Sequence, residues 1–163
     1  MAKPIHFFAK TDAYHQLSNF APFGFEEGGL RWPTVEHYFQ AQKFIDLGHR
    51  ERILKAHSPQ QAKTLGQSRA FPIRDDWDQI KDAVMKHALL KKFEDPTLRL
   101  LLLETKSRPL IENSPYDRYW GIGRDGKGKN VLGRLLAEVR TEIRNADQAN
   151  TRESAPATHA RKF

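Results

Sequence analysis

The sequence predicts a compact single domain of the α+β class, mainly α-helical, with a small β-hairpin or sheet near its N-terminus. Its 163 residues are enough for one domain with a real core. Segments with helical periodicity or helix caps occupy most of the chain from residue 35 onward. Segments typical of strands are short and lie mostly before residue 33.

The expected strands come first along the chain. Residues 5–9 are typical of an opening strand, and residues 23–32 of a β-hairpin that turns at Gly28-Gly29. Residues 109–112 form a later short strand candidate. The expected helices span residues 35–47, 49–56, 59–66, 77–93, 96–105 and 131 to about 145.

Residues that favour N-terminal caps mark several of these helix starts. Ser58 before Pro59 is a good pair of cap and first-turn residue. Asp75 or Asp76 is the expected cap of the long central helix, and Asn130 is the expected cap of the last one.

Residues 1–146 form the expected domain, and residues 147–163 form an expected disordered polar tail. The tail sequence has no periodicity and few apolar residues to bury. It holds three basic and two acidic residues, so the excess of positive charge belongs to the folded body.

The net charge of +7, from 27 Lys and Arg against 20 Asp and Glu, suits an anionic partner such as a nucleic acid, a nucleotide or a phosphorylated metabolite. The basic residues are interleaved with acids and form no known nucleic-acid module. The absence of cysteine excludes disulfides and thiolate zinc sites, and no histidines form an i, i+4 pair, so we expect no metal site. Without a long apolar run or a signal peptide, we expect a cytoplasmic protein with no membrane partner.

Residues 32–45, Trp-Pro-Thr-Val-Glu-His-Tyr-Phe-Gln-Ala-Gln-Lys-Phe-Ile, form the most informative segment. Its Pro-Thr pair is typical of a helix start and places Glu36 in the first turn. At 3.6 residues per turn, Glu36, Gln40 and Lys43 project from one side of an otherwise apolar helix. Buried polar groups need partners, so a carboxylate there is either structurally paired or kept for chemistry. A first-turn Glu that merely favours the helix dipole is the alternative interpretation.

A glycine-rich segment, residues 121–133, leads into the last helix. Glycines admit close backbone approach and helix starts attract anions, so Lys127, Lys129 and Asn130 form a candidate phosphate cradle. The segment nearly matches a Walker A loop, but Asn130 stands where Ser or Thr would bind magnesium, and no buried parallel strand precedes it. A glycine-rich surface turn is the alternative.

The three tryptophans, Trp32, Trp77 and Trp120, all lie beside charged residues at expected element ends. An aromatic ring at a pocket mouth can stack on a flat heterocycle, which makes each a candidate binding residue. Each is equally explained as an anchor of the core. Asp117 has two structural alternatives, as a turn residue or as a partner of Arg118.

Several motifs stand out together: Ser18-Asn-Phe, Trp32-Pro-Thr-x-Glu-His-Tyr-Phe-Gln-Ala-Gln-Lys, Arg74-x-Asp-Trp, Tyr119-Trp-Gly, and Gly126-x-Gly-Lys-Asn-x-Leu-Gly. They resemble the YbiA-like NADAR family, over about residues 5–144. The resemblance implies a compact, mainly helical α+β fold without a metal or organic cofactor. It also implies N-glycosidase activity, which bacterial and plant members are described as directing at early intermediates of riboflavin biosynthesis.

Cleavage of an N-glycosidic bond passes through an oxocarbenium-like sugar, which requires a carboxylate to stabilise positive charge or activate water. The residues and the resemblance agree on Glu36 as general base and oxocarbenium stabiliser. Asp117 is the second catalytic candidate, as a ligand of ribose hydroxyls or of the attacking water. The expected substrate-binding residues are Asn19, Trp32, Gln40, Lys43, Trp77, Trp120, Gly121, Lys127, Lys129 and Asn130.

The expected reaction is hydrolysis of the bond between ribose 5-phosphate and the aminopyrimidine of an early riboflavin intermediate. The closest alternative is removal of ADP-ribose from a modified guanine in nucleic acid, which uses the same kind of bond. A non-catalytic nucleotide-binding or RNA-binding module is the alternative from a different class, and it leaves the polar stripe at Glu36 unexplained.

Overall fold

The structure is a computed structural model that describes residues 2–156. Helices dominate this part of the chain, which confirms the predicted α+β class. The helices are η1 (His15–Leu17, a 3-10 helix), α1 (Val35–Gln42), α2 (Leu47–Leu54), α3 (Pro59–Gln67), α4 (Trp77–Lys92), α5 (Pro96–Glu104) and α6 (Val131–Glu153). The strands are β1 (Ile5–Phe7), β2 (Phe25–Glu27), β3 (Leu30–Trp32) and β4 (Leu110–Glu112).

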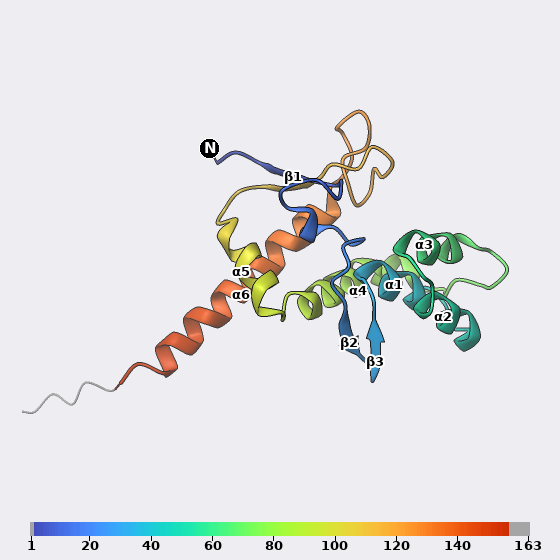
Figure 1. Ribbon diagram of the computed structural model, residues 1–163, viewed down its shortest axis with the longest axis horizontal. Helices are drawn as coiled ribbons and strands as arrows, with labels where there is room; N and C mark the ends of the chain where they lie inside the picture. The colour runs from blue at the N-terminus through green and yellow to red at the C-terminus, as the bar shows by residue number, and fades with distance from the viewer. Residues whose placement is uncertain (1, 157–163) are drawn as a thin grey trace, which may run out of the picture.

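Two groups of helices share the core (Figure 1). Helix α1 packs against α2, α3 and α4, which form one side of the molecule. Helix α6 packs against α4, α5 and β4, and its C-terminal half projects away from the body. Helix α4 contacts both α1 and α6 and so joins the two groups.

The strands pair in two ways. β2 and β3 form the predicted antiparallel hairpin, with Phe25 opposite Trp32. β1 and β4 lie side by side and run parallel, with Ile5 opposite Leu110 and Phe7 opposite Glu112. This parallel pairing connects the start of the chain to a segment more than a hundred residues later, and it places Glu112 at the carboxyl end of β4.

Two helix boundaries differ from the prediction in the first helical region. The helix expected over residues 35–47 ends at Gln42, and α2 begins at Leu47 rather than at residue 49. The break is stabilised by the Asp46 side chain, which caps α2 by accepting a hydrogen bond from the His49 backbone N at 2.7 Å.

The caps are confirmed in part. Ser58 Oγ accepts from the Gln61 backbone N, as expected of a cap. Asp76 is the N-cap residue of α4, but its side chain makes no capping bond because it pairs with Arg74 at 2.6 Å. Asn130 precedes α6 with a φ of 51°, and its side chain also makes no capping bond.

Helix α6 continues to Glu153, well past the predicted end near residue 145. Residues 147–153 are therefore helical, and the prediction that disorder begins at residue 147 is wrong for them. Residues 145–155 contain neither Gly nor Pro, and Ala and Gln favour helix, so a formed helix propagates with little loss. Arg99 of α5 also pairs with Asp147. The remainder of the expected tail, residues 157–163, lies outside the described residues.

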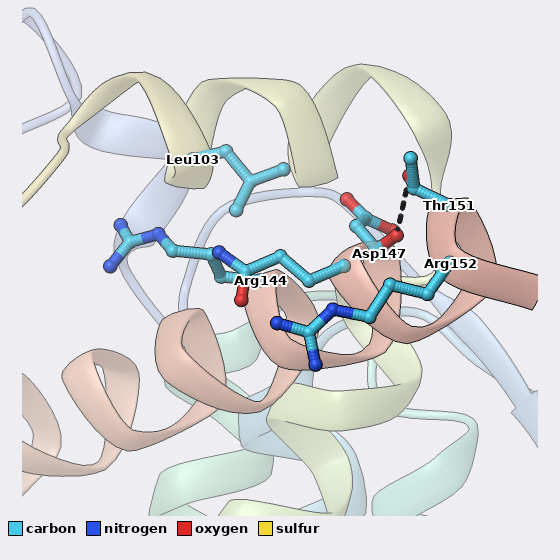
Figure 2. A pocket seen from close by; sticks show the side chains of 6 residues that line it. Leu103, Arg144, Asp147, Thr151 and Arg152 are labelled. Carbon is cyan, nitrogen blue, oxygen red and sulfur yellow. Dashed lines mark hydrogen bonds between the residues drawn. The ribbon is translucent and has the colours of Figure 1, made fainter. Parts of the chain in front are cut away.

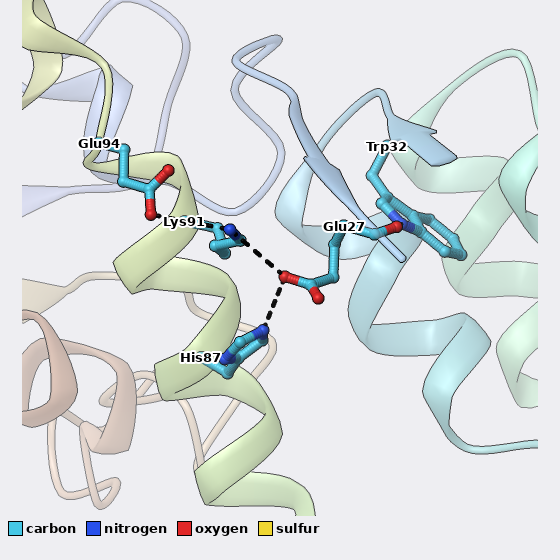
Figure 3. Close-up of polar contacts among 5 residues, drawn as sticks. All are labelled: Glu27, Trp32, His87, Lys91 and Glu94. Atoms are coloured by element: carbon cyan, nitrogen blue, oxygen red, sulfur yellow. Dashed lines mark hydrogen bonds and ion pairs between the residues drawn. The ribbon is translucent and has the colours of Figure 1, made fainter. Parts of the chain in front are cut away.

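The hairpin is attached to α4 by charged contacts (Figure 3). The Glu27 carboxylate lies 2.8 Å from His87 Nε2 and 3.7 Å from Lys91 Nζ. Trp32 is 3% exposed, and its indole N–H donates to the Glu27 carbonyl at 3.2 Å. Trp32 is therefore an anchor of the hairpin, the structural alternative considered for it.

Helices α1 and α3 approach closely at Gly66. A Cβ atom built on Gly66 would lie 2.0 Å from Gln40 Oε1 and 3.0 Å from Gln40 Cβ. No side chain fits between these helices at that point, so the contact fixes the place of Gln40.

We expect the Gly66→Ala substitution to destabilise the fold by about 1–3 kcal/mol, because the added methyl group would overpack this contact. The free energy of unfolding from urea titration measures the effect. Gly48→Ala is the matched control, since its Cβ would meet only Asp46 Oδ1 at an ordinary 3.4 Å. Equal stability of the two variants would contradict the close packing of α1 on α3.

Lys92 of α4 is 1% exposed and has no acidic partner among the described residues. Its Nζ donates to the carbonyls of Gln16 and Ser18 at 2.5 and 2.9 Å, which ties η1 and its C-terminal end to the core. Burial lowers the pKa of Lys92 from 10.5 to about 7.

The pKa of Lys92 gives stability a pH dependence. Between about pH 7 and 10.5 the unfolded chain binds a proton at Lys92 that the folded chain does not. The free energy of unfolding should therefore rise with pH in this window, by at most about 1.4 kcal/mol per unit. Urea titrations at pH 7, 8 and 9 should show a flatter profile for Lys92→Met than for the wild type; parallel profiles would contradict a depressed pKa.

Candidate functional site

A cleft of about 620 Å³ opens where α1, α3, α4 and the segments around residues 8–20 and 112–120 meet. Three carboxylates, Glu36, Glu112 and Asp117, lie along its wall. The other lining residues are Phe8, Ala9, Lys10, Ser18, Asn19, Phe20, Phe39, Gln40, Lys43, Gln60, Lys63, Gln67, Trp77, Lys81, Met85, Ser114, Tyr116, Tyr119, Trp120 and Leu132.

The polar stripe predicted on α1 faces this cleft. Glu36 and Gln40 are each 6% exposed, and Gln40 Nε2 donates to Glu36 Oε1 at 2.7 Å. Burial raises the pKa of Glu36, while the hydrogen bond from Gln40 and the charges of Lys63 and Lys43 act in the opposite direction. The carboxylate is therefore both desolvated and partnered, which is the state expected of a group kept for chemistry.

Asn19 lines the cleft beside this stripe. Its carbonyl accepts from the Glu36 backbone N at 3.2 Å, and its side-chain amide points to Met85 Sδ at 3.5 Å. Within residues 2–156, three buried side-chain oxygens of the cleft lining lack a hydrogen-bond partner: Asn19 Oδ1, Gln40 Oε1 and Glu112 Oε2. Unsatisfied buried polar atoms are rare, and their grouping on one cleft is typical of a site that receives a polar ligand.

Glu112 is the acidic residue that the sequence reasoning missed. Burial raises its pKa to about 7, and the nearby charges of Asp117 and Glu36 add to this shift. A signal was available, because a carboxylate at the carboxyl end of a parallel strand lies where ligands often bind. The strand itself was expected, but its parallel pairing with β1 was not.

Asp117 combines a turn role with a place in the cleft. Its Oδ1 accepts from the backbone N atoms of Tyr119 and Trp120 at 2.9 and 2.7 Å. Arg118 pairs with Asp125 at 2.7 Å instead of with Asp117. The turn fixes one oxygen of Asp117, and the residue still lines the cleft.

Aromatic rings form another part of the cleft. Phe39 of α1 lies 5.0 Å from the Trp77 ring and 5.2 Å from the Trp120 ring, measured between centroids. All three residues line the cleft, including both Trp77 and Trp120, which the sequence analysis names as candidates for stacking. The arrangement provides flat apolar surface for a heterocycle.

Positive charge concentrates on the cleft near Lys43. Its Nζ donates to the Gly66 carbonyl at 3.2 Å. Burial lowers the pKa of Lys43, and the positive charges of Arg69, Lys63 and Lys81 lower it further. Three of these four cations, Lys43, Lys63 and Lys81, line the cleft itself. Cations crowded in this way favour an anionic ligand.

Five residues expected to bind substrate do not line the cleft: Trp32, Gly121, Lys127, Lys129 and Asn130. Residues 124–127 and Lys129 of the glycine-rich segment are exposed, and neither Lys127 nor Lys129 lines the cleft, so the phosphate cradle stays a prediction. Lys129 Nζ lies 5.5 Å from the centre of the ring of Tyr119, a residue that does line the cleft.

Gly121 and Asn130 contact Glu112 instead of the cleft. A Cβ on Gly121 would lie 2.1 Å from Glu112 Oε2. Asn130 Oδ1 accepts from the Glu112 backbone N at 2.9 Å, and its Nδ2 donates to the Leu110 carbonyl at 2.9 Å. Both residues therefore support the strand that carries Glu112.

A second hollow, of about 500 Å³, lies between α5 and the distal part of α6 (Figure 2). It is lined by Leu103, Arg144, Asp147, Gln148, Thr151 and Arg152, and it shares no residue with the first cleft. Its carboxylate, Asp147, is paired with Arg99. The hollow therefore lacks the grouped acids and aromatic rings of the first cleft.

Among residues 2–156, no group of three or more His, Cys, Asp or Glu side chains could hold a metal ion. Nor does any helix in this part of the chain combine the length and apolarity needed to cross a membrane.

Comparison with known proteins places the chain. The NADAR domain model matches residues 6–144. N-glycosidase YbiA of Escherichia coli is 46% identical over 140 residues, which cover 85% of this chain and 88% of that protein. The NMR structure of E. coli YbiA superimposes with a TM-score of 0.82 at 42% identity, covering 98% of this chain and 93% of that one. The maize chloroplastic riboflavin biosynthesis protein PYRR is 41% identical over 155 residues, covering 85% of this chain and 25% of that protein. The chain therefore belongs to the NADAR domain family and is an N-glycosidase.

Proposed function

We propose that this N-glycosidase hydrolyses the bond between ribose 5-phosphate and the aminopyrimidine of an early riboflavin biosynthesis intermediate. The observation that carries the proposal is the buried Glu36 carboxylate in a cleft that also contains two tryptophans and three lysines near one another. A relative named as a riboflavin biosynthesis protein supports the choice of substrate class.

Glu36 supplies the negative charge that the reaction needs. As the C1′–N bond breaks, positive charge develops on the ribose ring, and a desolvated carboxylate stabilises it more strongly than water would. The same carboxylate can accept a proton from the attacking water. Gln40 holds one carboxylate oxygen at 2.7 Å and so limits the orientations available to Glu36.

The cleft contains residue types that suit both the base and the phosphate of the substrate. Trp77 and Trp120, which both contact Phe39, provide stacking surface for the pyrimidine. Lys43 and Lys63 provide positive charge for the 5′-phosphate, in place of the exposed lysines of the glycine-rich turn. Asn19 and Asp117 offer polar oxygens to the ribose hydroxyls.

Removal of ADP-ribose from a modified guanine is the second candidate. The net charge of +7 favours it, because a nucleic-acid substrate is a polyanion. The catalytic carboxylates would be the same for both substrates. Release of ribose 5-phosphate from riboflavin intermediates, assayed beside release of ADP-ribose from ADP-ribosylated DNA, separates the two candidates. Tight binding of either without turnover would support a binding module instead.

We expect Glu36→Gln to lower kcat by about 10²-fold or more while the protein stays folded, because Gln keeps the shape of the side chain but not its charge. Steady-state kinetics and circular dichroism measure the two effects. Glu26→Gln, at an exposed position of the hairpin, is the matched control and should leave kcat unchanged. A Glu36→Gln enzyme with more than about a tenth of wild-type kcat would remove Glu36 from the mechanism.

We expect Lys63→Ala to raise KM by about tenfold or more with a smaller change in kcat, because a charge-assisted contact to phosphate contributes binding energy in the ground state. The Lys127→Ala, Lys129→Ala double variant should change KM by less than about twofold, since both side chains are exposed. Kinetics with the phosphorylated riboside measure both. The opposite ranking of the two variants would return the phosphate site to the glycine-rich turn.

A further inference from the structure

The contacts around Glu112 are more numerous than a strand end requires. Asn130 fixes the Glu112 backbone N, and the Ile122 backbone N donates to the Glu112 carbonyl at 3.0 Å. Gly121 lies so close to Glu112 Oε2 that any side chain there would collide with the carboxyl group. Residues of the Tyr-Trp-Gly and Gly-Lys-Asn motifs thus both contact Glu112, which lies outside the two motifs.

The carboxyl group of Glu112 meets conditions that disfavour its charge. The side chain lines the same cleft as Glu36 and Asp117, so two other acids face it. Its Oε2 is buried without a hydrogen-bond partner. A buried anion without a partner costs several kcal/mol, whereas a protonated carboxyl avoids most of this cost.

Burial raises the pKa of both Glu36 and Glu112, and the negative charge of Asp117 adds to both shifts, but their other polar neighbours differ. Glu36 receives a side-chain hydrogen bond from Gln40 and lies near Lys43 and Lys63. At Glu112, a backbone hydrogen bond from Ser114 and the charge of Lys63 favour the anion, whereas the negative charges of Asp117 and Glu36 disfavour it. Two acids with environments that differ in this way divide into a base and an acid.

We infer that Glu112 is the general acid of the reaction, which donates a proton to the nitrogen that leaves C1′. This role rests on the proposed glycosidase function of the cleft. A carboxyl pKa of about 7 leaves about half of the Glu112 side chains protonated at neutral pH, which is the range expected of a general acid.

The proposed step balances as follows. The C1′–N bond breaks, its electron pair goes to nitrogen, and that nitrogen takes the proton from the Glu112 carboxyl group. Water adds to C1′ and gives its proton to the Glu36 carboxylate. Proton exchange with solvent then restores neutral Glu112 and anionic Glu36, so the net change is hydrolysis with no other reactant.

Glu112→Gln tests this role with two substrates at several pH values. On the aminopyrimidine riboside 5-phosphate, wild-type kcat/KM should fall as pH rises through about 7, and the variant should be slower by about 10²-fold without this alkaline fall. On 4-nitrophenyl riboside 5-phosphate, whose nitrophenolate leaves without a proton, the variant should be close to wild type. Glu104→Gln, an exposed acid of α5, is the matched control.

Carboxyl ¹³C NMR titration of the wild-type protein gives a readout that needs no substrate. A carboxyl resonance with a midpoint near pH 7 should be present in the wild type and absent from Glu112→Gln. Absence of such a resonance from the wild type would overturn the inference, as would a variant that keeps the alkaline fall or loses both substrates equally. A wild-type enzyme that cleaves neither riboside would instead overturn the proposed function.

Discussion

The hydrogen bond from Gln40 to the Glu36 carboxylate is the interaction on which the cleft depends. It partners a carboxylate that is almost completely removed from water, and a buried acid without such a partner would either take up a proton or destabilise the helix. Helix α1 can hold this pair because α2, α3 and α4 surround it, so neither side chain can turn out to solvent. Gly66 completes the arrangement by allowing α3 to press directly against Gln40.

A second close contact, between Gly121 and Glu112, supports another part of the cleft. Gly121 leaves room for the Glu112 carboxyl group, and Asn130 replaces a helix cap with two hydrogen bonds to β4. At both places a glycine at a crowded contact leaves room for a polar side chain. Gly66 does so for Gln40, and Gly121 does so for Glu112. The stability that ordinary core packing provides elsewhere in the molecule allows the cleft to keep unpartnered polar oxygens at Asn19 and Glu112.

The sequence predicts the features that depend on local interactions, and it misses those that depend on contacts between distant parts of the chain. The stripe of Glu36, Gln40 and Lys43 depends only on helical periodicity, and it lines the cleft as expected. Glu112 was missed because its place depends on the parallel pairing of β1 with β4, which joins distant parts of the chain. A local glycine pattern predicts that Lys127 and Lys129 bind phosphate. Whether they line the cleft depends instead on how the folded turn packs against the rest of the molecule, and they do not line it. Trp32 is a binding candidate because it lies beside charged residues at an expected element end, whereas its indole N–H bonds to the Glu27 carbonyl within the hairpin.

A crystal structure of the Glu36→Gln protein with the uncleaved aminopyrimidine riboside 5-phosphate is the most direct test of this account. The account expects C1′ of the ribose to lie between residues 36 and 112, the pyrimidine against Trp77 or Trp120, and the phosphate beside Lys43 and Lys63. A phosphate bound at Lys127 and Lys129, or a sugar held away from Glu36 and Glu112, would contradict it.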